Sequence, residues 1–382
     1  GGPGQVTHSR LRPAAARADG LDRRGCGLGI DVVDDDIGAI LRETNAKVLV
    51  TLGSMPKTDV AQKAHLAAAM APSVKTILEV DLKRYLSPPI SWLVPLLRPK
   101  LTSAPGIKVM NFNDAMDGED GNNLSFTEEG GSEKISAYFH TGGTTGMPKI
   151  AQHKQRGMLY NGLGPSLALI TEESVMLCPL PMFHVMAAYP MFMACIWSGA
   201  HLVMPTPQGY RGDGVMDNFW KLCERWKVTF MVTVPTAASA LKQRPVNADM
   251  STVQYAFCGS APLPVELFKQ FEKATGVMIL EGYGMTEACS TATILPAEEH
   301  VPGSKRLASV GKPALGVQLT IQDEDGNQLP RGEIGEVCSR GGNLMREYWN
   351  KPEATEEVFR GGWYHTGDAG YKDEDGFVFL VD

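Results

Sequence analysis

The sequence predicts an α/β protein in which helices cover mostly parallel sheets, followed by a β-rich region. Two observations lead to this prediction. From Ile37 onward, short apolar runs that suit buried strands alternate with longer amphipathic stretches that suit helices. Such alternation is typical of parallel sheets with helices on their faces. After about Ser309 the pattern changes to short alternating strands separated by turns at 323–327 and 373–376.

Composition narrows the classes of partner. The 382 residues are 43% hydrophobic and 21% charged, which is typical of a globular chain large enough for more than one core. The formal net charge of −7 argues against nucleic acid as a partner. No apolar run is long enough for a transmembrane segment. The seven cysteines occur singly, which predicts reduced thiols and a cytoplasmic location.

The elements follow in order along the chain. Residues 1–36 are rich in Gly, Ala and Arg and show no helical or strand period, so we expect them to be disordered or artefactual. A buried-strand run at 47–52 opens the α/β region, with a helix at 59–70 and a strand at 76–80. Residues 84–132 are expected to be irregular because they contain proline pairs and an acidic, glycine-rich stretch.

The remaining expected elements continue the alternation. Strands are expected at 134–138, 174–180, 200–204, 228–234, 253–258 and 277–281, and in the β-rich region at 316–322, 333–339 and 376–381. Helices are expected between them, among others at 186–197, 215–226 and 264–275.

A loop rich in glycine and threonine follows the strand expected at 134–138. It contains Thr141, Gly142, Gly143, Thr144, Thr145 and Gly146, and it ends at Lys149. Glycines let backbone N–H groups approach an anion closely, and hydroxyls and a lysine add donors and positive charge. The loop therefore predicts a phosphate site, although a loop of this composition taken alone could equally be a flexible surface turn.

The spacing of this loop fits two common nucleotide motifs poorly. The P-loop of NTPases has Gly-Lys followed directly by Ser or Thr. Here Met147 and Pro148 separate Gly146 from Lys149, and Ile150 follows. No G-x-G-x-x-G opens a helix at this loop, as a Rossmann dinucleotide site requires. A P-loop ATPase or kinase is therefore disfavoured.

Two further motifs complete a pattern. The sequence EGYGMTE at 281–287 follows an apolar run, and WYHTGD occupies 363–368. Weaker motifs are PMFH at 181–184, GSAPL at 259–263 and GEIGE at 332–336. In this order, the motifs resemble the adenylate-forming superfamily of acyl-CoA synthetases, peptide-synthetase adenylation domains and luciferases. The resemblance covers roughly residues 37–382. The sequences of the motifs are most similar to those of an AMP-dependent acyl-CoA synthetase of bacterial type.

The resemblance implies a domain organisation. It predicts an incomplete αβ subdomain with the phosphate-binding loop at 37–206, a second αβ subdomain at 207–308 and a distorted β-barrel subdomain at 309–382 that ends at a hinge. Family members have further sequence on both sides, including a small C-terminal domain that carries a catalytic lysine. We expect this chain to lack that domain, and therefore to be weakly active or inactive, and to aggregate or form a homo-oligomer.

The resemblance also implies a reaction and its cofactors. A carboxylic acid attacks the α-phosphate of ATP, which gives an acyl-adenylate and pyrophosphate, and the thiol of coenzyme A then displaces AMP. Preorganised donors and Mg²⁺ reduce the repulsion between the two anions. Two alternatives stay open: an acyl-AMP ligase that loads a carrier protein, and a fragment that binds ATP or acyl-AMP without turnover.

By resemblance, each motif residue receives a role. Residues 141–146 and Lys149 hold the β- and γ-phosphates, Glu287 holds Mg²⁺, and Thr286 donates to the α-phosphate. Tyr283 packs on adenine and Asp368 accepts hydrogen bonds from the ribose hydroxyls. The rest of the nucleotide site comprises Gly259, Ser260, Ala261, Glu281, Gly282 and Gly284. Outside their motifs, Lys149, Tyr283 and Asp368 would instead be interpreted as a solvated lysine, a core tyrosine and a turn aspartate.

The acyl pocket is expected to be mostly apolar. His184 lies near the substrate carboxylate and the thiol tunnel, although a loop histidine bonded to backbone is the simpler alternative. The other expected lining residues are Met186, Ala187, Val234, Thr236, Met285 and Cys289. Because none of them is a strong cation or anion, the acid is expected to be a fatty or aryl acid, and fatty acid metabolism is the expected context.

Overall fold

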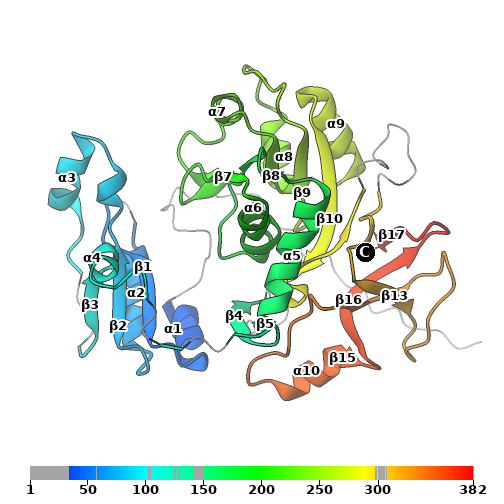
Figure 1. Cartoon of the computed structure of the whole chain (residues 1–382), viewed down its shortest axis with the longest axis horizontal. Coiled ribbons are helices and arrows are strands. Elements are labelled where there is room, and N and C mark those ends of the chain that lie inside the picture. Colours follow the sequence, from blue (N-terminus) through cyan, green and yellow to red (C-terminus); the bar gives the residue numbers. More distant parts are fainter. Residues whose placement is uncertain are drawn as a thin grey trace, which may run out of the picture. The chain divides into compact units, whose positions relative to one another are not determined.

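The computed structural model describes residues 34–56, 58–101, 105–123, 126–127, 130–141, 149–296, 299, 306 and 308–381. The chain divides into two compact units, residues 1–118 and 119–382. Both units combine helices with parallel strands (Figure 1), so the predicted α/β class is confirmed.

The first unit is built on a three-stranded parallel sheet in the order β1-β2-β3. Its elements are α1 (Asp34–Glu43), β1 (Val48–Leu52), α2 (Val60–Ala69), β2 (Thr76–Val80), η1 (Leu82–Tyr85), α3 (Ile90–Leu97), β3 (Lys108–Asn111) and α4 (Phe112–Asp117). Leu41 of α1 and Ala67 of α2 pack with Ile77 of β2, which is fully buried. The helix and two strands predicted between 47 and 80 are confirmed to within one residue at each end.

The expectation that residues 84–132 are irregular is wrong where α3, β3 and α4 lie. Pro88 and Pro89 precede α3, and Pro95 lies inside it. Proline is compatible with the start of a helix but removes a hydrogen bond from its interior, which is why the sequence favoured a loop. β3 has only four residues, too few for a period to show.

The second unit contains a seven-stranded sheet in the order β12-β11-β10-β9-β8-β6-β7. Its strands are β6 (Val175–Leu177), β7 (His201–Val203), β8 (Phe230–Thr233), β9 (Tyr255–Cys258), β10 (Met278–Met285), β11 (Ser290–Ile294) and β12 (Lys312–Pro313). The strands from β10 to β7 are parallel, as predicted, whereas β11 and β12 are antiparallel. β10 continues beyond its predicted end and carries most of the 281–287 motif.

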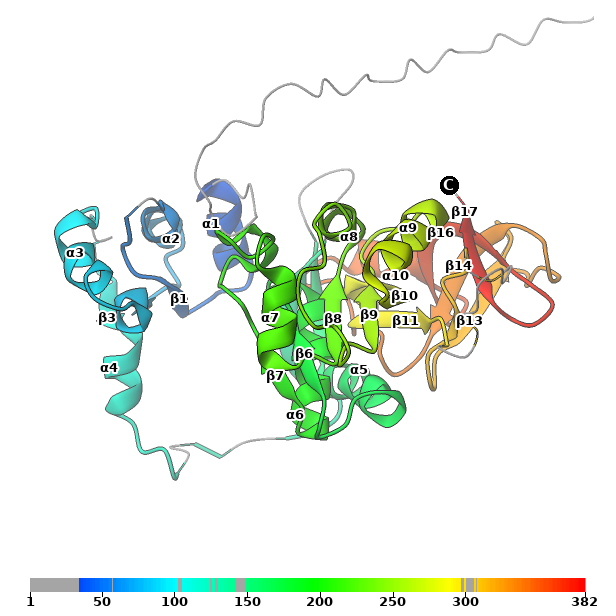
Figure 2. The same cartoon turned by 90° about the horizontal axis from the view of Figure 1, so that it is seen from above.

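Helices cover both faces of this sheet; Figure 2 shows α8 and α9 on one side and α5 and α6 on the other. The helices are α5 (Gln155–Ala168), η2 (Ala187–Met193), α6 (Ala194–Ser198), η3 (Gly209–Arg211), α7 (Phe219–Trp226), α8 (Pro235–Leu241) and α9 (Val265–Thr275). Phe219 and Phe271 pack on one face with Met231, and Met191 packs on the other with Phe230. Neighbouring residues of β8 thus enter opposite cores, as the two-residue period of a strand requires.

A curled half-barrel sheet of five strands forms the β-rich region. Its strands are β13 (Gln318–Gln322), β14 (Gly335–Arg340), β15 (Phe359–Arg360), β16 (Trp363–Lys372) and β17 (Val378–Val381), and α10 (Pro352–Val358) precedes β15. Ile321, Val337 and Val378 are buried together in its core. The change to β structure predicted after Ser309 is therefore confirmed.

A separate antiparallel pair flanks the Gly/Thr loop. It consists of β4 (Ile135–His140) and β5 (Ile150–Lys154). Residues 347–349 lie along β5: the backbone N–H of Trp349 donates to the oxygen of Ile150 at 2.7 Å, and that of Gln152 donates to the oxygen of Glu347 at 3.0 Å. This pairing brings two distant segments of the chain together beside the loop.

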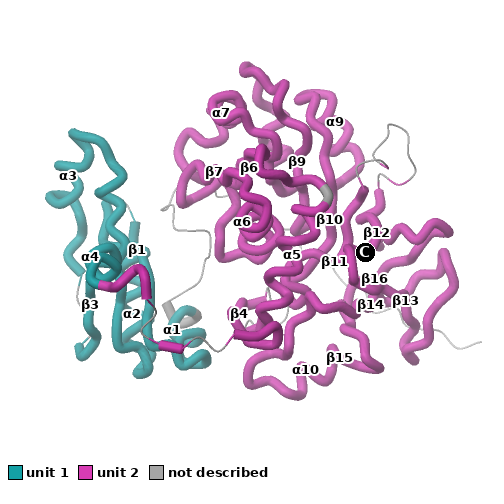
Figure 3. The backbone as a smooth tube through the Cα atoms, in the orientation of Figure 1, with its two compact units in different colours: residues 1–118 teal, residues 119–382 magenta. Residues whose placement is uncertain are grey.

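The boundary between the two units, after residue 118 (Figure 3), falls within the range predicted for the first subdomain, 37–206. The predicted subdomain limits at 206 and 308 stay predictions. Among the described residues, no helix combines the length and the apolar character that crossing a membrane requires.

Candidate active site

A cavity of about 330 Å³ lies in the second unit, between α5, η2 and the strands β9, β10 and β11. Apolar side chains such as Leu169, Met191 and Leu280 form much of its wall. The residues predicted for the site that line it are His184, Met186, Gly259, Ser260, Glu281, Gly282, Tyr283, Gly284, Met285 and Thr286. Three motifs that are distant in sequence thus meet at one cavity.

Glycines allow the backbones around the cavity to approach closely. A Cβ on Gly284 would lie 1.6 Å from the backbone oxygen of Ser290 on β11, and a Cβ on Gly259 would lie 3.2 Å from that of Gly282. Ser260 has a φ of 71°, and its Oγ lies 3.5 Å from the sulfur of Met186. The shape of this wall therefore depends on small residues.

Tyr283 and Asp368 connect the cavity to the half-barrel sheet. The hydroxyl of Tyr283, on β10, donates a 2.5 Å hydrogen bond to Oδ2 of Asp368, on β16. Burial raises the pKa of Tyr283, and the charge of Asp368 raises it further, so this hydroxyl remains a donor at neutral pH. The contact joins the 281–287 motif to the 363–368 motif.

Tyr348 connects Lys149 to Glu287. The Nζ atom of Lys149 lies 4.5 Å from the centre of the Tyr348 ring, a distance that suits a cation–π contact. The Tyr348 hydroxyl donates to Oε1 of Glu287 at 2.7 Å. Glu287 belongs to the short helix η4 (Thr286–Ala288), which directly follows β10. One buried aromatic side chain thus brings Lys149, at the end of the Gly/Thr loop, near the acid predicted to hold Mg²⁺.

The Gly/Thr loop is described only at its two ends. Thr141 is buried, and its backbone N–H donates to the oxygen of Lys149 at 2.8 Å, which closes the base of the loop. The predicted phosphate-binding residues Gly142, Gly143, Thr144, Thr145 and Gly146 lie outside the described residues.

His184 and Glu281 are two of the titratable groups that line the cavity. Nδ1 of His184 accepts a 3.3 Å hydrogen bond from the backbone N–H of Met186. Partial burial lowers the pKa of His184, and the nearby charge of His140 lowers it further, which favours a neutral imidazole. The side chain of Glu281 is buried, and its Oε1 accepts from the backbone N–H of Leu263 at 3.1 Å. Burial raises the pKa of Glu281 to about 7.

Some of the predicted residues do not line the cavity. Ala187 is fully buried in the core beneath η2, and Cys289 is fully buried with Val185 and Tyr189. The other residues outside the wall are Thr141, Lys149, Val234, Thr236, Ala261, Glu287 and Asp368. Glu287 and Asp368 each neighbour a wall residue, because Thr286 directly precedes Glu287 and Tyr283 bonds to Asp368. The roles assigned to these residues stay predictions.

Sequence reasoning missed three residues that shape the site. Tyr348 lies outside every motif, and only its spatial contacts show its place. Tyr160 and Asn161 of α5 line the cavity. The Asn161 side chain is buried, and its Oδ1 accepts from the backbone N–H of Thr291 at 2.9 Å. No local signal singles out Asn161, because the glycines and Pro165 of α5 favour a loop.

The arrangement suits a ligand with an apolar end and an anionic end. The apolar cavity accepts the first, while Lys149 supplies positive charge for phosphate. The carboxylate of Glu287 suits a divalent cation, and that of Asp368 suits two neighbouring hydroxyls. Activation of a hydrophobic acid by a nucleotide is chemistry that these groups can support.

The sequence is similar to a family of nucleotide-binding enzymes and to proteins named as CoA ligases. Residues 27–349 match the family model described as AMP-binding enzyme. The chain is 37% identical over 261 residues to marinolic acid–CoA ligase of Pseudoalteromonas sp., covering 65% of this chain and 39% of that protein. It is 34% identical over 263 residues to 4-coumarate-CoA ligase 2 of Narcissus pseudonarcissus, covering 66% of this chain and 45% of that protein. The chain therefore spans less than half the length of these relatives.

The fold is similar to that of a solved anthranilate CoA ligase in complex with anthranoyl-AMP. The TM-score is 0.73 at 23% sequence identity, and the match covers 91% of this chain and 61% of that one. At this identity the likeness establishes the fold, namely parallel sheets with helices on both faces and a half-barrel sheet.

Proposed function

Since this chain belongs to the family of AMP-binding enzymes, we propose that it forms the nucleotide- and acyl-binding part of an AMP-forming acid–thiol ligase. In this reaction a carboxylic acid and ATP give an acyl-adenylate and pyrophosphate, and the thiol of coenzyme A then displaces AMP. The observation that carries the proposal is the convergence of the motifs on one apolar cavity, where Tyr283 lines the wall and bonds to Asp368. Both relatives described above are named CoA ligases.

The charged residues support a site for Mg²⁺ and ATP. Lys149 supplies a positive charge at the base of the Gly/Thr loop, where it would hold the β- and γ-phosphates. Glu287 fits a magnesium ligand, because a carboxylate oriented through one oxygen by Tyr348 can offer the other to the metal. When bound, Mg²⁺ would neutralise phosphate charge. Thr286, in the cavity wall, is proposed to donate to the α-phosphate.

Asp368 and Tyr283 are proposed to hold the nucleoside. Asp368 would accept from the two ribose hydroxyls, and Tyr283 would pack on adenine beside Gly259 and Ser260. The bond from Tyr283 to Oδ2 of Asp368 fixes one carboxylate oxygen and so orients the carboxylate. A carboxylate has lone pairs enough to accept from the tyrosine and from two vicinal hydroxyls together.

A hydrophobic acid, aryl or fatty, is the proposed substrate. The walls near Leu169, Met191 and Ile294 are apolar, and the volume of about 330 Å³ suits a small molecule. The names of the two relatives, a marinolic acid ligase and a coumarate ligase, are consistent with such acids. Fatty acid metabolism is the broader proposal for its context.

Location and assembly complete the proposal. The cysteines of the described part, from Cys178 to Cys338, are free and buried, which is consistent with a reducing cytoplasm. A homo-oligomer is the proposed assembly, because β1 is an edge strand of the first unit's short sheet and carries the apolar residues Val48 and Val50. Light scattering, which measures the molar mass of the chain in solution, tests the proposed homo-oligomer.

Calorimetric binding of a non-reactive aryl-adenylate analogue tests the proposed function. The unmodified chain should bind, and Asp368→Ala should weaken binding about tenfold through loss of a charged acceptor. Asp213→Ala, which removes an exposed carboxylate elsewhere, serves as the control. Absence of binding by a folded chain, or equal affinity of Asp368→Ala and the unmodified chain, would contradict the proposal.

A further inference from the structure

The ladder between β14 and β16 is interrupted where Asp368 lies. Glu336 pairs with Ala369 and Cys338 pairs with His365, so one residue of β14 faces three residues of β16, 366–368. The three residues form a bulge, in which Gly367 has a φ of 78°. A bulge leaves backbone groups without ladder partners and aims side chains out of the sheet. Asp368 is accordingly exposed, although it belongs to a strand.

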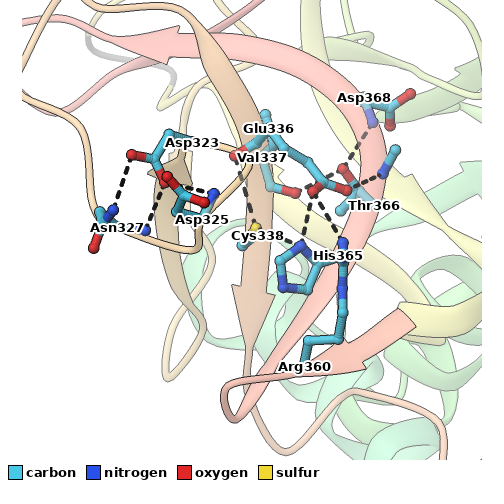
Figure 4. A network of polar contacts seen from close by, with 11 residues as sticks. Asp323, Asp325, Asn327, Glu336, Val337, Cys338, Arg360, His365, Thr366 and Asp368 are labelled. Atoms are coloured by element: carbon cyan, nitrogen blue, oxygen red, sulfur yellow. Dashed lines mark hydrogen bonds and ion pairs between the residues drawn. The ribbon is translucent and has the colours of Figure 1, made fainter. Parts of the chain in front are cut away.

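Side chains replace the missing ladder bonds (Figure 4). Oε1 of Glu336 accepts from the backbone N–H of Gly367 at 2.9 Å. Oε2 of the same carboxylate lies 2.7 Å from Nδ1 of His365, which donates when that nitrogen carries the proton. Glu336 therefore holds the bulge on both sides of Thr366. The turn is fixed by a carboxylate that comes from the neighbouring strand.

Thr366 adds a second connection to β14. Its Oγ1 donates to the backbone oxygen of Val337 at 2.7 Å and accepts from the backbone N–H of Asp368 at 3.1 Å. The backbone of Asp368 is thus tied to the bulge by Thr366, and the bulge is tied to β14 by Glu336. The carboxylate of Asp368 in turn accepts from the hydroxyl of Tyr283. Together these contacts connect Glu336 on β14 to Asp368, the proposed ribose ligand.

Two more groups surround Glu336. Nη2 of Arg360 lies 3.6 Å from its Oε2, and Sγ of Cys338 lies 3.4 Å from Nδ1 of His365. The ligand atoms of Glu336, Cys338 and His365 lie within 4.8 Å of one another, a spacing that a metal could also use. Both oxygens of Glu336 already have donors, however. The hydrogen-bonded network therefore explains the cluster without an ion.

We propose that Glu336 is the positioning residue for Asp368, and that it acts by fixing the bulge at 366–368. This inference rests on the proposed function, because it takes Asp368 as the residue that accepts from the ribose. A charged acceptor at Gly367 N–H holds a turn that the strand ladder does not hold. Without the Glu336 carboxylate, the bulge has more accessible conformations, and Asp368 can meet the ribose hydroxyls in only a smaller fraction of them.

A double-mutant cycle with two nucleotides separates positioning from a general loss of structure. The variants are Glu336→Ala, Asp368→Ala and the double variant, and the ligands are AMP and 2′,3′-dideoxy-AMP, measured by calorimetry. Glu336→Ala should weaken AMP binding about tenfold but leave dideoxy-AMP binding unchanged. In the Asp368→Ala background it should have no further effect. Equal losses for both nucleotides, or additive losses in the double variant, would overturn the proposal.

Two further variants sharpen the result. Glu336→Gln keeps an oxygen that can accept from Gly367, so it should recover part of the AMP affinity that Glu336→Ala loses. Glu333→Ala removes an exposed glutamate of the same motif and should bind AMP like the unmodified chain. A glutamine variant as weak as the alanine variant would show that the bond to Gly367 is not what matters, and the proposal would fail.

Hydrogen exchange of the ligand-free chain tests the positioning independently of nucleotide binding. Glu336→Ala should increase amide exchange across 365–369, whereas Glu333→Ala should not. If the chain binds no AMP, the proposed function fails, and this measurement still decides whether Glu336 orders the bulge. Unchanged exchange would overturn the positioning role. Faster exchange of the unmodified chain after treatment with EDTA would also overturn it, because the three ligand atoms would then hold a metal.

Discussion

The ammonium group of Lys149 lies 4.5 Å from the centre of the Tyr348 ring, while the hydroxyl of the same tyrosine donates to Glu287. Tyr348 is 3% exposed, and its backbone forms an isolated antiparallel β-bridge with Ala151 of β5. Burial and the hydrogen bond to Glu287 therefore hold the ring on a backbone that is itself paired. A cation and an anion that are both proposed to meet ATP are therefore oriented by one side chain. Changes to Tyr348 should affect nucleotide binding although it belongs to no sequence motif.

The hydroxyl of Tyr348 can be removed while its ring is kept. In Tyr348→Phe, Glu287 loses a donor but Lys149 keeps an aromatic face, so we expect Mg²⁺-ATP to bind about fivefold more weakly. Tyr348→Leu also removes the cation–π contact and should weaken binding more. Calorimetry with Mg²⁺-ATP measures both variants. Wild-type affinity in Tyr348→Phe would show that the bond to Glu287 is irrelevant to the nucleotide.

Glu287 should matter for the metal and not for the nucleoside. Glu287→Gln keeps an oxygen that can accept from Tyr348 but removes the negative charge. We expect Mg²⁺-ATP to bind about tenfold more weakly, because Mg²⁺ prefers carboxylate ligands, while AMP without metal binds as before. Glu353→Gln, an exposed position on α10, controls for the change in net charge. Unchanged affinity for Mg²⁺-ATP would remove Glu287 from the metal site.

Gly284 should not tolerate even a methyl group. Because its Cβ would lie 1.6 Å from the backbone oxygen of Ser290, Gly284→Ala must push β10 and β11 apart. We expect the free energy of unfolding to fall by about 1–3 kcal/mol, measured by urea denaturation. A Cβ on Gly342 would meet no heavy atom within 4 Å, so Gly342→Ala is the matched control and should change it by less than about 0.5 kcal/mol. Equal effects of the two variants would refute the steric explanation.

The fold was predictable where local pattern and tertiary packing agree. β1 and β2 are short apolar runs with β-branched residues, and both were predicted. A helix was expected in the gap that α5 fills, but its bounds were not predicted, because it contains several glycines and Pro165, which favour a loop. Its packing explains their presence: a Cβ on Gly162 would lie 2.7 Å from that of Met193 on η2. Tertiary contact therefore overrides local propensity in this helix.

The site was predictable as motifs but not as contacts. Tyr283 and Asp368 are conspicuous because glycine and threonine surround them in short motifs. Their hydrogen bond joins residues 85 positions apart, and that from Tyr348 to Glu287 spans 61 positions. Hydrophobic period carries no information about such pairs. Likewise, the bulge that requires Glu336 exists only once β14 and β16 are paired.

Glu281 should make stability depend on pH. Burial raises its folded-state pKa to about 7 from an ordinary value of 4.5, so the folded chain binds the proton more tightly than the unfolded chain. The unfolding free energy should therefore fall as the pH rises from 4.5 to 7, and above pH 7 the loss of stability due to Glu281 is complete. Glu281→Gln, whose amide oxygen can still accept from Leu263, removes this cost. We expect the variant to be more stable than wild type by about 2–3 kcal/mol at pH 8.

The comparison must be made at several pH values, because other groups titrate in both proteins and cancel only in the difference. Urea denaturation at pH 8 and at pH 5 gives that difference. The advantage of Glu281→Gln should shrink towards pH 5, where the wild-type carboxyl is already protonated in the folded state. A difference that does not vary with pH would mean that Glu281 is not buried as a titrating acid.

Gly164 lies where stability and ligand size can be separated. It lines the cavity from α5 together with Tyr160 and Asn161, on the face that the helical repeat predicts for positions three and four residues apart. A Cβ at Gly164 would meet no heavy atom within 4 Å. Gly164→Ala should therefore stabilise the helix by about 0.5–1 kcal/mol and leave binding nearly unchanged.

Gly164→Leu should instead reduce the space for the acyl group. A leucine at this position extends into the cavity of about 330 Å³, so a bulky aryl-adenylate analogue should bind about tenfold more weakly, while an acetyl-adenylate analogue should bind as it does to the unmodified chain. Calorimetry with the two analogues provides the comparison, and Gly164→Ala provides the control for the loss of glycine. If both analogues lose affinity equally, the cavity beside α5 does not hold the acyl group. If only the aryl analogue loses affinity, the acyl pocket lies between α5 and β10.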